Sequence, residues 1–358
     1  MVERARCTGC GACAAVCGEG AVTMERDREG FCYPILNAAR CTHCGRCERA
    51  CPIGKAGTGA GERLYLGARA KEADARLAGS SGGMFPLLAA QVLEDGGVVF
   101  GAAMGEDGQV RHIGIERPED IGRIARTKYV QSSLARVWEE LPGHLRAGRP
   151  VLFCGTPCQA AALRGCFGGD ANLLLADLIC YGVPSPGIWE RYVRFLERRC
   201  HGKFQSFFFR DKRGKDNGQT VALTVGGQEY TRPLHQDPFC RSFFYNVNIR
   251  PSCFRCPYCT VQRSSDLTLG DFWGIEEVKP GWDDGLGQSA VICHTPAGKR
   301  LWSRVQEKTE WFSCREEEVA NARQPRLREP VKPSRRRSLY LWFYRWLPFS
   351  VWIRFFSR

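Results

Sequence analysis

The chain has 358 residues, of which 44% are hydrophobic and 25% charged, a composition typical of a globular protein with one large domain or two smaller ones. The formal net charge of +13 does not indicate nucleic-acid binding, because more than half of the excess lies in residues 332–358, which contain seven Lys or Arg and no acidic residue. No apolar run is long enough for a membrane-spanning helix. Nucleic acid is therefore not an expected partner.

The 20 cysteines are the most unusual part of the composition. The first residues, MVERARCTGC, include no apolar signal-peptide segment, so the disulfide framework of a small secreted protein is not expected. Reduced thiols that bind metal are the better interpretation. We therefore expect a cytoplasmic metalloprotein.

Two cysteine runs of identical spacing, CxxCxxCxxxC, lie within the first 55 residues. Three closely spaced thiolates can bind one face of a cubane, while the fourth points to the neighbouring cluster. The spacing therefore predicts two [4Fe–4S] clusters that exchange one ligand each. The predicted ligands are Cys7, Cys10, Cys13 and Cys51 for the first cluster, and Cys17, Cys41, Cys44 and Cys47 for the second.

This duplicated pattern resembles the bacterial two-cluster ferredoxins. Gly9, Gly11 and Gly45 would permit the tight turns that bring the backbone close to the inorganic sulfides. The sequence departs from the family at Gly18, where a proline is usual, but this change removes no ligand. Structural zinc is the alternative, although zinc sites use pairs of CxxC separated by a longer loop.

The composition divides the chain into a ferredoxin-like domain (1–55), a Gly-rich linker (56–62), a main body (63–328) and a basic, aromatic tail (329–358). Hydrophobic patterns in the body predict a helix within 83–96, a strand at 98–104, a strand–turn–helix unit at 150–163, a buried strand within 172–182, a helix at 188–200, and antiparallel strands at 203–210 and 220–227. The predicted fold class is α+β, with a mixed α/β catalytic body and a small N-terminal ferredoxin-like domain.

A third cysteine run, CFRCPYC, lies in the body and predicts another cluster, with structural zinc as the alternative. Its cysteines are Cys253, Cys256 and Cys259. A cubane needs a fourth ligand, and the candidates at the ends of predicted strands are Cys154, Cys158 and Cys180. Cys158 is favoured because it lies at the turn into a helix, where the helix dipole stabilises a thiolate.

Iron–sulfur clusters carry single electrons, so chemistry on a closed-shell substrate calls for a converter such as a flavin. The sequence has no GxGxxG motif after a strand, which argues against a Rossmann nucleotide site. It does have loops of small residues at 80–83, 155–157 and 270–274. Free backbone N–H groups at helix starts are natural binding sites for a pyrophosphate.

The strings GSSGGMF, RTKYVQSS, VLFCGTPCQ, CYGVPSP and RSSDLTLGDFWG, in this order, resemble the beta-subunit family of coenzyme F420 hydrogenases and dehydrogenases over residues 63–310. The resemblance implies an FAD beside a [4Fe–4S] cluster, with hydride transfer to or from an organic substrate such as coenzyme F420. The implied flavin contacts are Ser80, Ser81, Gly82, Gly83, Lys128, Tyr129, Gln131, Ser132, Gly155 and Thr156. Relatives often have His where this chain has Tyr181, and no catalytic acid or base is predicted.

The tail combines clustered arginines with aromatic residues, which is typical of a helix at the surface of an anionic membrane. The alternative is a helix packed on the body or on a partner subunit. Two functions remain open: a flavin-dependent oxidoreductase, or a non-catalytic relay subunit that passes electrons between proteins at a membrane. The expected partners are an electron-donor or acceptor protein, a small redox substrate and, through the tail, the inner face of a membrane.

Overall fold

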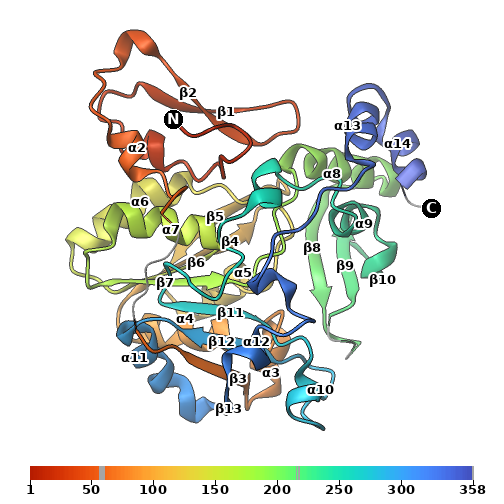
Figure 1. Cartoon of the computed structure of the whole chain (residues 1–358). Coiled ribbons are helices and arrows are strands. Elements are labelled where there is room, and N and C mark those ends of the chain that lie inside the picture. Colours follow the sequence, from red (N-terminus) through yellow and green to blue (C-terminus); the bar gives the residue numbers. More distant parts are fainter. Residues whose placement is uncertain (56–60, 215, 217, 357–358) are drawn as a thin grey trace.

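The computed structural model describes residues 1–55, 61–214, 216 and 218–356. Residues 56–60, which make up most of the predicted linker, lie outside this part of the chain. The N-terminal domain sits as a separate lobe on one end of a larger body, and the C-terminal helices lie on the same end (Figure 1). The body therefore presents one crowded end and one free end.

A sheet of eight strands forms the centre of the body. Its strands are β3 (Leu64–Ala70), β4 (Val98–Met104), β5 (Val110–Ile115), β6 (Val151–Gly155), β7 (Leu173–Leu178), β11 (Leu267–Asp271), β12 (Ser289–Cys293) and β13 (Thr309–Cys314). The spatial order is β13–β3–β12–β11–β7–β6–β4–β5. The four middle strands from β11 to β4 run parallel, and the outer strands are antiparallel to their neighbours.

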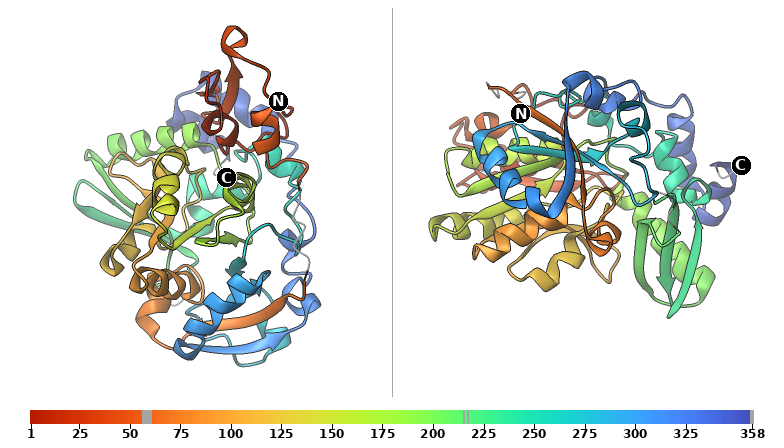
Figure 2. Two further views of the ribbon diagram at one scale, coloured as in Figure 1. Left: turned by 90° about the vertical axis from the view of Figure 1, so that its left-hand side faces the viewer. Right: turned by 90° about the horizontal axis from the view of Figure 1, so that it is seen from below.

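Helices cover both faces of this sheet, as Figure 2 shows from two further directions. Leu152 of β6 packs with α4 (Met84–Glu94) and α11 (Pro296–Val305). Its neighbours Val151 and Phe153 point the other way and pack with α6 (Ala135–Arg146) and α7 (Pro157–Phe167). Because successive side chains of a strand alternate between faces, the uninterrupted apolar run VLFCG suits a strand covered on both sides. Short helices complete the layers: α3 (Ala73–Ala78), α5 (Ile121–Ile124), α10 (Ile275–Val278) and α12 (Glu316–Val319).

A second, antiparallel sheet lies beside the first and carries the C-terminal helices. It consists of β8 (Phe204–Asp211), β9 (Thr220–Val225) and β10 (Gln228–Pro233), and packs with α8 (Pro186–Cys200) and α9 (Pro238–Phe244). The tail forms α13 (Arg337–Trp346) and α14 (Phe349–Phe356), whose Tyr340 and Trp352 are fully buried in the same core. One side of the tail therefore packs on the body. None of the described helices is long and apolar enough to cross a membrane.

The N-terminal domain repeats its structure as it repeats its sequence. It contains the hairpin β1 (Val22–Arg26) and β2 (Cys32–Leu36), and the short helices α1 (Ala12–Ala15) and α2 (Arg46–Ala50). Gly11 and Gly45 precede these helices with φ of 80° and 72°, and Gly9 and His43, two residues earlier, also have positive φ. Glycine adopts this left-handed conformation without a steric penalty, which accounts for its use in the two cysteine loops.

The predicted fold class is confirmed: a mixed α/β body carries a small ferredoxin-like domain. The helix expected within residues 83–96 is α4, and the strand expected at 98–104 is β4 with the same bounds. The strand–turn–helix unit is β6 followed by α7, and the expected antiparallel pair is β8 and β9.

Candidate functional site

The cysteines predicted to bind the first cluster come together in the N-terminal domain. Cys7, Cys10, Cys13 and Cys51 all line one cavity of about 30 Å³, to which Cys47 also contributes. Burial, and then the neighbouring thiolates of Cys10 and Cys7, raise the pKa of Cys13 to about 12. Protonated thiols this close together are well placed to exchange their protons for iron.

The cysteines predicted for the second cluster lie on the duplicated loop and are more accessible. Cys44 is exposed, and the backbone N–H of Arg46 lowers its thiol pKa. The N–H of Ala21 donates a hydrogen bond to Cys17 Sγ over 3.3 Å. Within the described residues, no three His, Cys, Asp or Glu side chains lie close enough to hold a single metal ion. Cubane ligands bond to four separate iron atoms, so they need a wider spacing than the ligands of one zinc ion.

Five thiols form a further group in the body, which we call the third cysteine group: Cys158, Cys180, Cys253, Cys256 and Cys259. Burial, and then the thiolates of Cys158 and Cys256, raise the pKa of Cys253 to about 12. Burial and the thiolates of Cys253 and Cys158 raise the pKa of Cys180 well above its usual value. The pKa of Cys259, which a hydrogen bond from Cys256 lowers, is also influenced by Cys180.

Cys154, the remaining candidate for a fourth ligand, lies outside this group. Burial raises its pKa to about 12, and the nearest charged groups are those of Asp177 and Lys128. Cys158 lies in the first turn of α7, and Cys180 follows β7. These two thiols therefore remain as candidates to complete a set of four with the CFRCPYC run.

Arg250 ties the N-terminal domain to the body. Its guanidinium donates hydrogen bonds to the carbonyl oxygens of Cys7 at 2.8 Å and Cys32 at 2.9 Å. It also donates to Gln131 Oε1 at 2.9 Å and stacks on the ring of Tyr33. Since the guanidinium is almost completely buried, these hydrogen bonds are made without competition from water.

Tyr258 lies between the first-cluster cysteines and the third cysteine group. Its hydroxyl donates to the carbonyl oxygen of Pro52 at 2.8 Å. Burial, followed by the thiolates of Cys158 and Cys10, raises its pKa far above the usual value. Trp138 Nε1 also donates to the Cys10 carbonyl oxygen at 2.9 Å. The loop predicted to hold the first cluster therefore faces the third cysteine group across the domain boundary.

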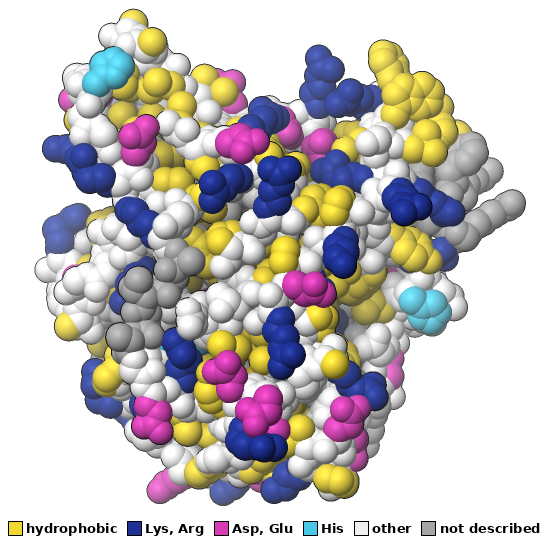
Figure 3. Space-filling view, in the orientation of Figure 1, with side chains coloured by type: hydrophobic (Ala, Val, Ile, Leu, Met, Phe, Trp, Pro, Cys, Tyr) yellow, Lys and Arg dark blue, Asp and Glu magenta, His cyan; other side chains and the backbone are white. Residues whose placement is uncertain are grey.

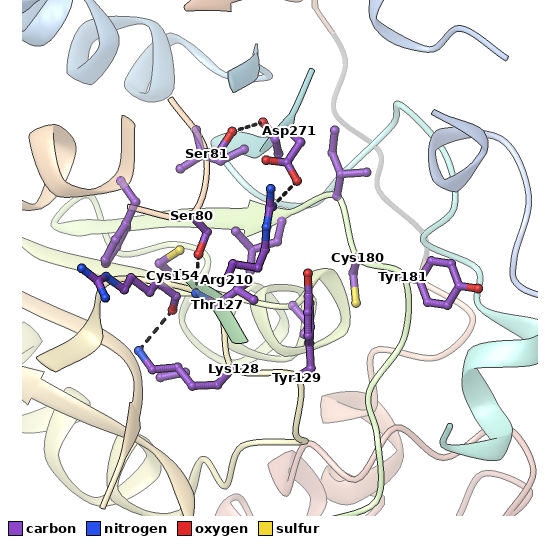
Figure 4. A pocket seen from close by; sticks show the side chains of 18 of the residues that line it. Ser80, Ser81, Thr127, Lys128, Tyr129, Cys154, Cys180, Tyr181, Arg210 and Asp271 are labelled. Carbon is purple, nitrogen blue, oxygen red and sulfur yellow. Dashed lines mark hydrogen bonds and ion pairs between the residues drawn. The ribbon is translucent and has the colours of Figure 1, made fainter. Parts of the chain in front are cut away.

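A cavity of about 560 Å³ opens at the carboxyl ends of β6, β7 and β11 (Figure 4). Its volume is in the range of cofactor and small-molecule sites, and its position is where open α/β sheets bind ligands. Eight of the predicted flavin contacts line it: Ser80, Ser81, Gly83, Lys128, Tyr129, Ser132, Gly155 and Thr156. Cys180 and Tyr181 line it too, so the cavity and the third cysteine group share a wall.

Two predicted flavin contacts, Gly82 and Gln131, do not line this cavity. The N–H of Gly82 donates to Ser289 Oγ at 2.9 Å, and a Cβ at this position would lie 2.6 Å from the carbonyl oxygen of Ala68. Gln131 instead joins the two domains, because its amide donates to the Thr8 carbonyl oxygen and accepts from Arg250. Both residues support the site from outside.

The charge of the cavity suits an anionic ligand. The cationic residues that line it are Arg126, Lys128, Arg210, Arg323 and Arg326. The one carboxylate among the described lining residues is Asp271, which forms an ion pair with Arg210. Nε and Nη1 of Arg326 are buried without a hydrogen-bond partner. Burial and the nearby Arg126 lower the pKa of Lys128 to about 7, so a bound anion would stabilise its charged form.

His112 adds a neutral hydrogen-bonding group to the cavity wall. Its Nε2 lies 3.0 Å from the carbonyl oxygen of Cys154, which can only accept, so Nε2 carries the proton. Burial lowers the pKa of His112 to about 4, and Nδ1 is buried without a partner. Sequence reasoning missed His112, Arg326, Arg250 and Tyr258, because each one gains its role from contacts with residues distant in the sequence.

Comparisons with known proteins give the family of each part of the chain. Residues 148–316 match the family described as the C terminus of the coenzyme F420 hydrogenase/dehydrogenase beta subunit, and residues 6–55 match a 4Fe-4S dicluster domain. No curated protein matches the chain. A chain from a xenon-derivatised structure of the F420-reducing [NiFe] hydrogenase complex from Methanosarcina barkeri is similar, with 17% identity and a TM-score of 0.45, over 70% of this chain and 81% of that one. The chain belongs to the coenzyme F420 hydrogenase/dehydrogenase beta-subunit family and carries an N-terminal 4Fe–4S dicluster domain.

Proposed function

We propose that the chain is an iron–sulfur flavoprotein oxidoreductase that links the clusters of its N-terminal domain to an organic substrate. The observation that carries this proposal is the continuous arrangement of Cys10, Tyr258 and Cys158, with Cys180 on the wall of the cavity. The third cysteine group would hold a [4Fe–4S] cluster, and the cavity would hold FAD. Bound FAD supplies the conversion between single electrons and a hydride.

The residues of the cavity divide into groups with different tasks. Ser80 is held in place because its hydroxyl accepts a hydrogen bond from the Thr127 N–H over 2.7 Å, which fixes the loop that faces the ligand. Lys128 and Arg326 offset the charge of the phosphates. His112 Nδ1 accepts a hydrogen bond from a ligand N–H or O–H group. Thr156 caps α7 and so fixes the turn that places Cys158.

The alternative, a non-catalytic relay subunit, explains less of the molecule. A relay needs clusters close to its partners, but it has no use for a cavity of about 560 Å³ lined by five cationic side chains. Family membership makes coenzyme F420 one candidate for the organic substrate. Its choice over other hydride acceptors rests on the family alone.

Anaerobic reduction of the purified holoprotein tests this function. Electrons supplied to the N-terminal clusters by a low-potential reductant should bleach the flavin absorbance. The Cys256→Ser variant should keep its flavin but lose this fast reduction, because one thiolate of the third cysteine group is gone. A holoprotein without flavin, or a flavin reduced equally fast in Cys256→Ser, would contradict the proposal.

We also propose that the exposed side of α13 binds the surface of an anionic membrane. Leu339, Trp342 and Trp346 share one side of this helix, with exposed fractions of 52%, 54% and 71%. Arg336 and Arg345 are exposed beside them, and residues 332–358 contain no acidic side chain. Figure 3 shows hydrophobic side chains gathered at the upper right, with Lys and Arg next to them. Tryptophan and arginine together favour the headgroup region of anionic lipid.

Vesicle binding tests this surface. The protein should sediment with vesicles that contain anionic phosphatidylglycerol, and binding should weaken by about tenfold or more when Trp342 and Trp346 are both replaced by Ala. Trp311, an exposed tryptophan on β13, provides the matched control, and Trp311→Ala should bind like the wild type. Equal binding by both variants, or sedimentation with neither neutral nor anionic vesicles, would rule out this membrane surface.

A further inference from the structure

The second-cluster loop is the accessible part of the N-terminal domain. Of its eight predicted cluster ligands, all within the described residues, Cys44 alone is exposed. The loop of the first cluster is covered by the body, since Arg250 and Trp138 bind its carbonyl oxygens. An external protein would therefore exchange electrons with this chain through the second cluster.

Three arginines surround the ligands of this cluster. Arg46 Nη1 lies 3.6 Å from the position that a Cβ at Gly18, next to Cys17, would take. Arg49 Nη2 donates to the carbonyl oxygen of Cys44 at 3.0 Å. Arg40, which precedes Cys41, reaches back over the same loop to Gly20. All three arginines are exposed.

These positive charges are not neutralised by neighbouring carboxylates. In the part of the chain that the structure describes, no ion pair joins Arg40, Arg46 or Arg49 to an acidic group. Glu48, on the same helix as Arg46, is instead paired with the N-terminal ammonium at 3.1 Å. Glu19 is the exposed carboxylate that remains on the facing loop. The face keeps a net positive charge.

An apolar strip lies next to the arginines. Ile35 and Leu36, at the end of β2, are both exposed large hydrophobic residues, and Ala38 and Ala39 continue the exposed strip towards Cys41. Apolar residues surrounded by charges of one sign are typical of a surface that binds a protein of opposite charge. The charges accelerate the encounter, and the apolar strip supplies contact area.

We propose that this face, formed by Ile35, Leu36, Arg40, Arg46 and Arg49, docks a small acidic protein that carries a one-electron redox group at its surface. The inference rests on the proposed function, of which it names the protein partner. In the docked pair one electron leaves the carrier and reduces one [4Fe–4S] cluster of the N-terminal domain, with no proton or bond change required. The reverse transfer uses the same face.

Stopped-flow reduction of the holoprotein by a purified acidic [2Fe–2S] ferredoxin tests this inference. The rate constant should fall as salt is added, because screening acts within about 10 Å at 0.1 M. Arg46→Glu should slow reduction at low salt by about tenfold and weaken the salt dependence. Arg40→Glu should act in the same direction, whereas reduction of either variant by methyl viologen radical should not slow.

Arg28→Glu is the matched control, because Arg28 is an exposed arginine in the hairpin turn of the same domain, at the edge that approaches α8. It should leave the ferredoxin rate within about twofold of the wild type. Iron content must be unchanged in every variant. Equal slowing by Arg28→Glu, or rates independent of salt and of Arg46, would overturn the docking face. Cluster reduction is measured directly, so absence of flavin would sink the proposed function without altering this result.

Discussion

Replacement of Arg250 by Met should release the N-terminal domain from the body while leaving its clusters assembled. The guanidinium donates to the carbonyl oxygens of Cys7 and Cys32, and hydrogen bonds to charged groups contribute about 1.5–3 kcal/mol each. A loss of about 3 kcal/mol from docking would raise the undocked fraction by roughly a hundredfold. Electron transfer from the N-terminal domain to the flavin should slow accordingly.

Arg4→Met provides the matched control for this prediction. Arg4 also stacks on the Tyr33 ring, at 3.9 Å, but its side chain is 62% exposed and pairs with Asp27 at the surface. Such pairs contribute about 1 kcal/mol or less. Limited proteolysis between the domains and the rate of flavin reduction should therefore change in Arg250→Met and not in Arg4→Met. Similar behaviour of the two variants would show that Arg250 does not hold the domains together.

Cys158→Ser should remove the cluster of the third cysteine group, lowering iron by about four atoms per chain and stopping electron flow to the flavin. Cys158 lies in the first turn of α7, a helix with a capping box formed by Thr156 and Gln159. The positive end of the helix dipole favours a thiolate at this position. Cys158 is also the member of the group whose charge acts on Cys10 of the N-terminal domain.

Cys180→Ser is the comparison that decides the assignment. Cys180 belongs to the same group of thiols but also opens onto the cavity, so this variant should retain the iron of the wild type and alter the flavin environment instead. Iron analysis and the electron paramagnetic resonance signal of each reduced variant report the number of clusters. Loss of iron in Cys180→Ser together with full iron in Cys158→Ser would transfer the fourth position to Cys180.

The sequence predicted the parts of the molecule that depend on local chemistry. The spacing of the N-terminal cysteines indicated which four would meet, and Cys7, Cys10, Cys13 and Cys51 do line one cavity. The apolar run of β6 and the capping residues of α7 likewise predicted a strand, turn and helix at the observed place. In each case the pattern that carries the prediction is a short stretch of sequence.

Features that depend on distant contacts could not be predicted in this way. Arg250 meets Cys7 across 243 positions, and Tyr258 meets Pro52 across 206. Neither residue type differs in pattern from an ordinary surface arginine or core tyrosine. The tail posed the same difficulty, because the buried Tyr340 and the exposed Trp342 alternate within one aromatic run. Only packing against α8 and α9 distinguishes its two sides.

Metal and cofactor analysis of the anaerobically purified protein is the first test of a chain in which clusters feed a flavin. Iron, sulfide, zinc and released flavin would be measured on the same sample. Three cubanes beside one flavin predict about twelve iron atoms, about twelve sulfides and one FAD per chain, with no zinc. About eight iron atoms with one zinc and no flavin would contradict this arrangement, because the N-terminal clusters would then have no redox centre in the body to serve.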